Sequence, residues 1–357
     1  MVAHLCCSVD AGYFLKRLKE DFPNEKIIGY FYDPNIHPYS EFKLRSLDTK
    51  RICEKLGVEY VEGEYNYEEW LNAVKGFENE PEKGSRCSIC FDFSLEESAR
   101  FAKSLGDTKI TTSLLMSPMK SHEQLKAIGN VVKKKYNTDF ILVDYRVKGG
   151  TQKQQEYAKE NQMYRQDYCG CLFGIWQQKE DQEIIDELLS PYPFAILPAS
   201  IEEKLKFYQY RMELEDKGVE YKIVKENFLN YRLLSSKIYS KKKPIIHYTL
   251  FYSYLDRPQR VRIEFIKDDI AYTNRAQIIF INLKKVNKIL KKEFKNVFDI
   301  YKNSLTYKEE LKLREEITHN KYSLSPIIVL DKFEDIRYDI DINSKIYPDN
   351  KEILIKF

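Results

Sequence analysis

Short apolar runs alternate with longer segments of helical periodicity over the first 145 residues. A parallel pair of strands needs a crossover between them, usually a helix, so this alternation predicts a parallel sheet covered by helices. We expect strands at 1–7, 26–32, 58–63, 109–115 and 139–145. We expect helices at 11–22, 40–56, 66–77, 88–105 and 121–136. The predicted fold class of this half is α/β, Rossmann-like.

The pattern changes from about residue 180. The segment 189–200, "LSPYPFAILPAS", contains three prolines and marks the predicted junction between domains. A helix at 200–217 and strands within 243–255, 259–273 and 277–283 follow, which is typical of an α+β module. We therefore predict a catalytic α/β domain at 1–180 and an α+β domain at 181–357.

Membrane and secreted classes find no support in the sequence. No apolar run approaches the ~20 residues that cross a bilayer. The first ten residues, "MVAHLCCSVD", lack the basic and long apolar regions of a secretory signal. We expect a cytoplasmic protein without a membrane partner, and the net charge of +3 does not identify its partners.

The seven cysteines are confined to the first half of the chain. In a reducing cytosol, grouped cysteines bind metals or take part in catalysis more often than they form structural disulfides. Cys53 stands alone in an amphipathic helix and is expected to pack in the core. The other six form three groups, Cys6–Cys7, Cys87–Cys90 and Cys169–Cys171.

The first two groups are placed to converge. Cys6 and Cys7 follow the first predicted strand, at the edge where open α/β sheets bind ligands. Cys87 and Cys90 lie three residues apart at the start of a helix, so their thiols share a face. The helix N-terminus and Arg86 should lower their pKa. Four thiolates could bind zinc or an iron–sulfur cluster, and small buried apolar residues are the alternative.

The third group has the form C-G-C. Gly170 lets the backbone bend enough to join Cys169 and Cys171, and a disulfide in so small a loop would be strained and easily reduced. This favours a redox relay. Two further metal ligands, or two inert thiols, are the alternatives.

Asp10 lies three residues after Cys7. It could cap the helix that follows, as aspartate often does. It could also place a hard oxygen ligand beside the thiols and hold a second metal ion.

Five motifs in order resemble the QueH-type epoxyqueuosine reductases over residues 1–175. These are "HLCCSVD", "GYFYDPNIHPYSEFKLR", "SRCSICFDFSLEESA", "TTSLLMSP" and "YRQDYCGCLF". The resemblance implies reduction of epoxyqueuosine to queuosine at the wobble position of tRNA, the last step of queuosine synthesis. It implies a [4Fe–4S] cluster on Cys6, Cys7, Cys87 and Cys90 and a redox-active Cys169–Cys171 pair, with an unidentified electron donor. Many members carry a third cysteine where this chain has Asp10. The resemblance with this substitution suggests that Asp10 binds a second, mononuclear iron.

This chemistry needs protons as well as electrons. Loss of an epoxide oxygen as water takes two electrons and two protons, and a Lewis-acidic iron could polarise the C–O bond. Asp33 and His37, in the predicted loop "DPNIHP", are candidates for proton transfer. A turn role explains the same residues equally well.

The cysteine-free half carries basic segments. In 281–298, Leu283, Val286 and Leu290 begin an apolar helical face that continues to Val297. Lysines cover the other sides, and "YSKKKP" at 239–244 adds a second basic cluster. We predict tRNA contact through Lys284, Lys288, Lys291 and Lys295, against the alternative that the lysines only confer solubility.

Two other functions remain open. The first is a zinc-stabilised nucleic-acid-binding module without catalysis, which would be colourless because zinc is d¹⁰. The second is a tRNA sulfur-transfer or nucleotide-activating enzyme, which needs a glycine-rich loop after the first strand. This chain has only Gly12 there, so we rank that function lowest.

Overall fold

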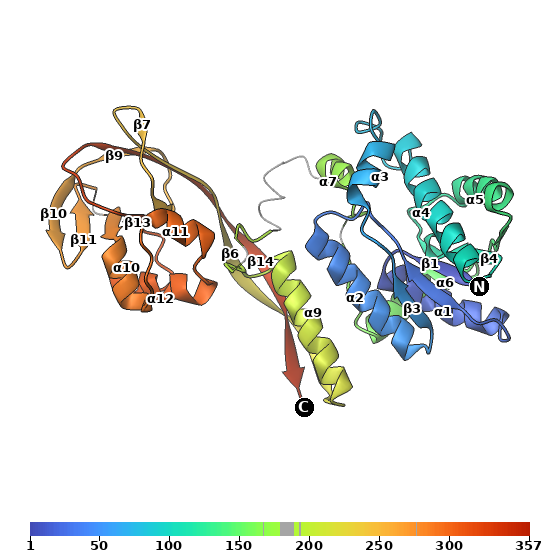
Figure 1. Ribbon diagram of the computed structural model, residues 1–357. Helices are drawn as coiled ribbons and strands as arrows, with labels where there is room; N and C mark the ends of the chain where they lie inside the picture. Colours follow the sequence, from blue (N-terminus) through green and yellow to red (C-terminus); the bar gives the residue numbers. More distant parts are fainter. Residues whose placement is uncertain (167, 179–188, 193, 276) are drawn as a thin grey trace. The chain divides into compact units, whose positions relative to one another are not determined.

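The computed structural model describes all residues except 167, 179–188, 193 and 276. Figure 1 traces the chain, which divides into two compact units. The first contains 1–182, 205–223 and 356–357, and the second contains 183–204 and 224–355. The domain boundary predicted near residue 180 falls outside the described residues.

The first unit contains the predicted parallel sheet. Its strands run in the order β3-β2-β1-β4-β5. They are β1 (Val2–Leu5), β2 (Ile28–Phe31), β3 (Glu59–Glu62), β4 (Lys109–Thr112) and β5 (Asp139–Phe140). All four pairings are parallel, with Val2 opposite both Ile28 and Ile110. The α/β prediction is therefore confirmed.

The edge strand β5 is shorter than predicted. Its ladder with β4 ends at the pair Ile110–Phe140. Beyond this pair, the Thr111 hydroxyl donates to the carbonyl of Ile141. A threonine side chain thus binds the backbone where strand pairing could have continued.

Helices pack in two groups around the sheet (Figure 1). One group contains α1, α2 and α6, and the other contains α4 and α5. The bounds are α1 (Ser8–Asp21), α2 (Tyr39–Lys55), α3 (Tyr67–Ala73), α4 (Ser85–Ser104), η1 (Ser113–Met116), α5 (His122–Tyr136), α6 (Gly150–Glu160) and α7 (Leu172–Gln178). Of these, α6 and α7 were not predicted, and η1 takes up residues 113–115 of the strand predicted at 109–115. No described helix is both long and apolar enough to span a membrane.

The core of this unit forms between β1 and α1. Every residue of β1 is buried, and Phe14, Leu15 and Leu18 of α1 are fully inaccessible. Cys53 of α2 is also fully buried in this cluster, and burial raises the pKa of its thiol to about 12. The predicted packing role of Cys53 is confirmed.

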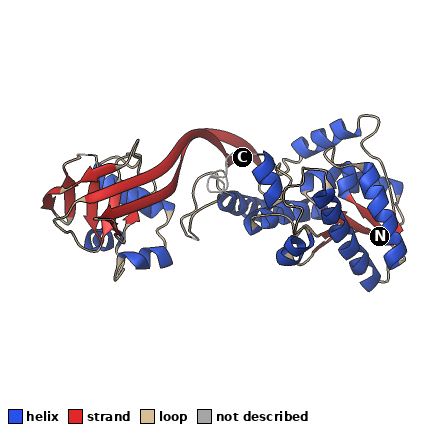
Figure 2. Ribbon diagram, turned by 90° about the horizontal axis from the view of Figure 1, so that it is seen from above, coloured by secondary structure: helices blue, strands red, loops and turns tan. Residues whose placement is uncertain are grey.

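The second unit is rich in strands (Figure 2). One sheet has the order β10-β11-β12-β13-β8 and the other β7-β6-β14-β9. The strands are β6 (Tyr221–Ser240), β7 (Lys243–Pro244), β8 (Tyr248–Thr249), β9 (Gln259–Val261), β10 (Ile263–Lys267), β11 (Ile270–Thr273), β12 (Ile279–Asn282), β13 (Ile327–Leu330) and β14 (Tyr338–Lys356). The helix α12 (Tyr307–Thr318) packs with α10 (Leu283–Leu290). The α+β prediction holds, but the two longest strands, β6 and β14, were missed.

The lysine-rich segment is not one continuous helix. The helix α10 ends at Leu290 because Lys291 adopts the left-handed conformation, with φ +55°. The Asn287 side chain then binds the backbone N–H and C=O of Phe294, closing a loop before α11 (Val297–Lys302). The spacing of apolar residues from Leu283 to Val297 therefore predicted a helix across a segment that is partly a loop. The hydrogen bonds of Asn287 that form this loop leave no trace in that spacing.

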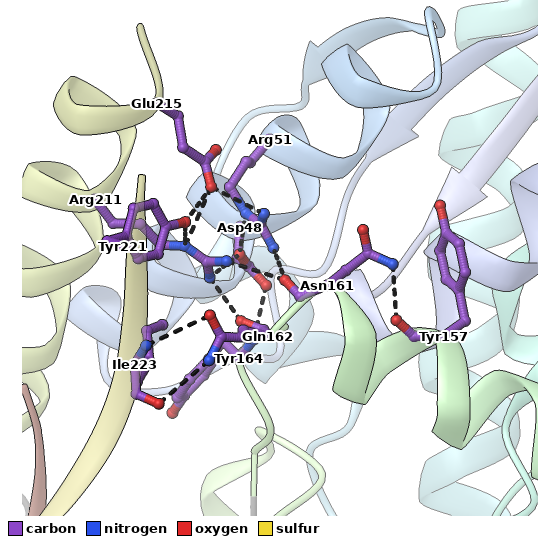
Figure 3. Close-up of polar contacts among 10 residues, drawn as sticks. All are labelled: Asp48, Arg51, Tyr157, Asn161, Gln162, Tyr164, Arg211, Glu215, Tyr221 and Ile223. Carbon is purple, nitrogen blue, oxygen red and sulfur yellow. Dashed lines mark hydrogen bonds and ion pairs between the residues drawn. The ribbon is translucent and has the colours of Figure 1, made fainter. Parts of the chain in front are cut away.

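The helix α9 (Ile201–Asp216) lies in the first unit from Leu205 onward and docks there through buried charges (Figure 3). Arg211 donates to the carbonyls of Gln162 and Asn161 at 2.6 and 3.0 Å. Arg51 of α2 donates to the same Asn161 carbonyl and, at 2.8 Å, to Asp48. Burial would raise the pKa of Asp48, but Arg51 and Arg211 outweigh it and hold that pKa below its usual range.

Replacing Asp48 with Asn should remove the only fully buried carboxylate that Arg51 and Arg211 share among the described residues, leaving them the partly exposed Glu215. We expect the free energy of unfolding to fall by about 3–5 kcal/mol at neutral pH. Because the folded-state pKa of Asp48 is depressed, its contribution is present above the unfolded pKa of about 3.9 and is lost as pH falls below that value. The difference between variant and wild type should therefore shrink on acidification.

Tryptophan fluorescence during urea unfolding measures this difference, since both tryptophans of the chain lie in the first unit. The control is Asp139→Asn, where the carboxylate is exposed and pairs with Lys133. That variant should change stability by less than about 1 kcal/mol. Equal effects of the two substitutions would show that Asp48 has no special electrostatic role.

Candidate metal and redox site

A cavity of about 270 Å³ opens at the carboxyl edge of the parallel sheet. Cys6 and Asp33 follow β1 and β2 directly, so neighbouring parallel strands deliver them to one edge. Other segments add further chemical groups to the lining, among them Asp10, Arg45, Cys90, Lys120 and Cys169. One member of each cysteine group, Cys6, Cys90 and Cys169, thus lines one pocket, whereas Cys7, Cys87 and Cys171 are not among its lining residues.

Cys6, Cys7 and Asp10 form a compact set of metal-ligand atoms. One ligand atom of each lies within 4.8 Å of the others. The two sulfurs are 3.9 Å apart, and Cys6 Sγ lies 3.6 Å from Asp10 Oδ2. Two thiols and a carboxylate suit a transition metal of borderline softness.

Asp10 does not cap the helix. The N-cap of α1 is Cys7, and no side chain accepts a hydrogen bond there. The Asp10 carboxylate instead faces the thiols, and Gln154 of α6 donates to it at 2.6 Å. The cap interpretation is wrong, and the interpretation as a ligand remains.

Cys87 and Cys90 lie at the start of α4, as predicted, but in different surroundings. Cys90 lines the cavity, whereas the Cys87 thiol is buried and accepts the backbone N–H of Lys83 at 3.3 Å. Arg86 donates instead to the carbonyl of Glu78, at 2.7 Å. Burial raises the pKa of both thiols, so the predicted lowering is wrong. Loss of hydration outweighs the charges at the helix end.

The C-G-C segment is locked against the loop that follows β2. Ile36 and Cys171 form an antiparallel bridge, and the His37 N–H donates to the Gly170 carbonyl at 2.8 Å. Gly170 has φ +103°, and a Cβ there would lie 2.9 Å from Ile36 Cγ1. Glycine is therefore required both by conformation and by space. Cys169 and Cys171 are free thiols in this structure.

Two cations that sequence reasoning missed hold Cys169. Lys120 Nζ donates to Cys169 Sγ at 3.3 Å, and Arg45 donates to the carbonyls of Cys169 and Tyr168 at 3.1 and 3.0 Å. Burial would lower the pKa of Lys120, but the neighbouring thiols outweigh it and raise that pKa. Arg45 ends the motif "GYFYDPNIHPYSEFKLR", and Lys120 lies two residues after "TTSLLMSP", so position in or beside a motif was the available signal.

The two proton-transfer candidates are separated. Asp33 lines the cavity, and burial raises its pKa well above the usual range. His37 is not among the lining residues, and its ring lies 5.5 Å from that of Tyr67. Three lining oxygens have no hydrogen-bond partner among the described residues, namely Asp33 Oδ2, Asn35 Oδ1 and Gln166 Oε1. Buried acceptors of this kind fit the donor groups of a polar ligand.

Known proteins resemble both the first half and the whole chain. The family model described as epoxyqueuosine reductase QueH matches residues 1–177. The QueH of Thermotoga maritima is 32% identical over 50% of this chain and 92% of its own length. The solved structure of the Methanococcus maripaludis U34-tRNA thiolase NcsA with its [4Fe-4S] cluster aligns with 59% of this chain and 72% of its own. At 15% identity and a TM-score of 0.34, it is too distant to bear on function.

The relative from Helicobacter pylori includes the second half. This epoxyqueuosine reductase QueH is 38% identical over 359 aligned residues, which cover 96% of this chain and 97% of the relative. The two chains are thus similar over nearly their entire lengths, and the family model matches the half that contains the cavity. Together these two findings establish the family. The chain belongs to the QueH family of epoxyqueuosine reductases.

Proposed function

We propose that this chain reduces epoxyqueuosine to queuosine in tRNA, the last step of queuosine synthesis. The observation that carries the proposal is the single cavity that brings Cys6, Cys90 and Cys169 together with Asp10. These are the groups that a metal-assisted two-electron reduction needs. A tRNA substrate places the activity in the cytoplasm.

The cysteines fit the [4Fe–4S] cluster that we assign to this site. Cys6 and Cys90 line the same cavity, Cys7 Sγ lies 3.9 Å from Cys6 Sγ, and Cys87 precedes Cys90 by three residues on α4. All four are free thiols. Such a cluster, when bound, supplies electrons one at a time.

Asp10 fits a second, mononuclear iron. Its carboxylate approaches Cys6, and Gln154 occupies only one of its two oxygens. A cationic metal held there would also compensate the buried negative charge. Its chemical contribution, when bound, is Lewis acidity toward an oxygen ligand.

Substituting Asn for Asp10 should preserve the hydrogen bond to Gln154 but remove the anionic oxygen. We expect the variant to retain its cluster colour, to lose about one iron per chain, and to lose activity by about 10- to 100-fold or more. Iron and sulfide analysis after anaerobic purification measures the first two effects. The matched control is Asp33→Asn, a carboxylate in the same cavity that should leave the iron content unchanged. Unaltered iron in the Asp10 variant would exclude the second iron.

The reaction balances with the groups present. Both C–O bonds of the epoxide break, a C=C bond forms, and the oxygen leaves as water after taking up two protons and two electrons. Cys169 and Cys171 together can release two electrons and two protons as they oxidise to a disulfide. A low-potential one-electron donor would then restore the dithiol. Because Cys169 lines the cavity, whereas Cys171 is buried and is not among the lining residues, Cys169 is the member that would meet the substrate.

Two side chains are placed to manage charge during this step. The Lys120 ammonium donates to Cys169 Sγ at 3.3 Å and places a positive charge beside this sulfur. Burial raises the pKa of Asp33, which lines the cavity, and this favours its use as a proton donor there. Arg45 donates to the backbone carbonyl of Cys169. This contact holds the Cys169 thiol in position before the substrate binds.

Expression in a bacterium that lacks its own epoxyqueuosine reductase tests the function. Its tRNA should contain queuosine in place of epoxyqueuosine when the chain is present, as measured by mass spectrometry of digested nucleosides. Persistent epoxyqueuosine with well-expressed, brown protein would contradict the proposal. A colourless zinc protein would favour the nucleic-acid-binding alternative.

A further inference from the structure

Two adjoining hollows on the second unit gather most of its arginines. The first, of about 630 Å³, is lined by Arg257, Arg260 and Arg275. The second, of about 520 Å³, is lined by Arg260, Arg262 and Arg337, together with Lys241. We call these two hollows the arginine groove. They share Arg260 and Asp339, so they form one surface along β9 and β14.

The concentration of arginine here is selective. The second unit contains seven arginines, and five of them line the groove. The other two, Arg232 and Arg314, are buried and donate to backbone carbonyls. A surface that needed only solubility would not require this segregation, since lysine and glutamate serve that purpose equally well.

The charges of the groove are largely uncompensated. Arg260 pairs with Asp339 at 2.9 Å. For the other four arginines, the described part of the chain offers no carboxylate within ion-pair distance; they are Arg257, Arg262, Arg275 and Arg337. All four side chains are exposed. The groove also contains Asp335 and Asp341, so its six cations outnumber its three carboxylates.

The turn between β6 and β7, at the edge of the groove, consists of two lysines whose backbone has positive φ. β6 and β7 are joined by Lys241 and Lys242, both with positive φ, at +46° and +66°. Asparagine and glycine are the residues that such two-residue turns favour. Two lysines at these positions are costly for the backbone and extend the positive surface next to Tyr239, an exposed aromatic ring.

We propose that the arginine groove binds the phosphate backbone of the tRNA substrate. Guanidinium groups bind phosphate oxygens in a bidentate manner, which lysine cannot do. A concave, cationic surface with an exposed aromatic ring suits a folded RNA better than a small anion. This inference rests on the proposed function for the identity of the RNA, and it gives the second unit a role that the family match at 1–177 does not cover.

The test replaces Arg257, Arg262, Arg275 and Arg337 together with Glu in the full chain. The probe is fluorescently labelled tRNA bearing epoxyqueuosine, and anisotropy gives its affinity at several salt concentrations. We expect a loss on the order of 100-fold at low salt. The slope of log affinity against log salt should flatten by about three, since each phosphate contact contributes roughly 0.7–0.9. Unchanged affinity would overturn the inference.

A matched variant carries the same four charge reversals elsewhere on the second unit. It changes Lys284, Lys288, Lys291 and Lys295, the exposed lysines that the sequence predicted to contact tRNA. We expect it to lose less than about tenfold, the nonspecific effect of changed net charge. An equal loss in both variants would overturn the assignment to the groove. A quadruple Arg→Gln variant, which avoids new repulsion, should still lose affinity and keeps the test valid if the Glu variant fails to fold.

Conversion of tRNA separates this inference from the proposed function. The groove lies outside the catalytic cavity, so the arginine variant should retain its iron content and raise KM with little change in kcat. If wild-type protein binds tRNA through the groove but converts none, the proposed function fails and the groove stands. If wild-type protein converts tRNA and the arginine variant has an unchanged KM, the groove fails and the function stands.

Discussion

Protein carrying Ala in place of Cys6, Cys7, Cys87 or Cys90 is expected to lose its brown colour and most of its iron. Each substitution removes one of the four thiolate ligands. An iron atom that lacks its thiolate would be released more easily, and the cluster would then be lost. Turnover should fall below detection in all four variants. Anaerobic purification, absorption spectra and iron and sulfide analysis measure these effects.

Cys53 provides the matched control. It is a free, fully buried thiol of the same unit, and it is not among the residues that line the cavity. Cys53→Ala should keep the spectrum and the iron content, with a loss in stability only. Retention of a full cluster in the Cys87 variant would show that this thiol, which does not line the cavity, is not a ligand. Stoichiometric zinc in wild-type protein would contradict the cluster altogether.

The second large effect concerns Cys169. A Cys169→Ser protein should retain the cluster, because the thiol belongs to a separate segment, yet reduce epoxyqueuosine on the order of 100-fold more slowly or worse. Serine preserves the size of the side chain but cannot form a disulfide or deliver a thiol's electrons. Spectra confirm the cluster, and nucleoside analysis after single turnover measures the reaction.

Two further variants sharpen the result. Cys171→Ser should have the same phenotype if the pair works as one dithiol. Lys120→Met, which removes the ammonium next to Cys169, should slow alkylation of Cys169 at neutral pH without releasing iron. Loss of the cluster in the Cys169 or Cys171 variant would make these thiols metal ligands and would refute the redox role.

The catalytic edge of the first unit was largely predictable from the sequence. Short strands and amphipathic helices of period 3.6 fixed the parallel sheet, and the sheet placed Cys6 and Asp33 at its carboxyl edge. The C-x-x-C spacing likewise placed Cys87 and Cys90 at one helix start. These features depend on local pattern, and local pattern is what a sequence displays directly.

Features that depend on distant contacts were not predictable. Arg45 reaches the carbonyl of Cys169 across 124 residues, and Lys120 reaches its thiol across 49. The strands β6 and β14 are mixed in polarity and are neighbours in one sheet despite their separation in the chain, so no alternation marked them. The pKa of Cys90 was predicted in the wrong direction because burial, which is a tertiary property, outweighs the local helix end.

Reduction of purified tRNA tests the central claim most directly. Anaerobically reconstituted protein is mixed with tRNA that carries epoxyqueuosine labelled with heavy oxygen in the epoxide, with dithionite as the electron source. The account predicts that queuosine forms, that the label leaves as water, and that two electrons are consumed per tRNA, with none of these in the Cys6→Ala protein. Epoxyqueuosine that persists unchanged with the intact, fully loaded protein would contradict it.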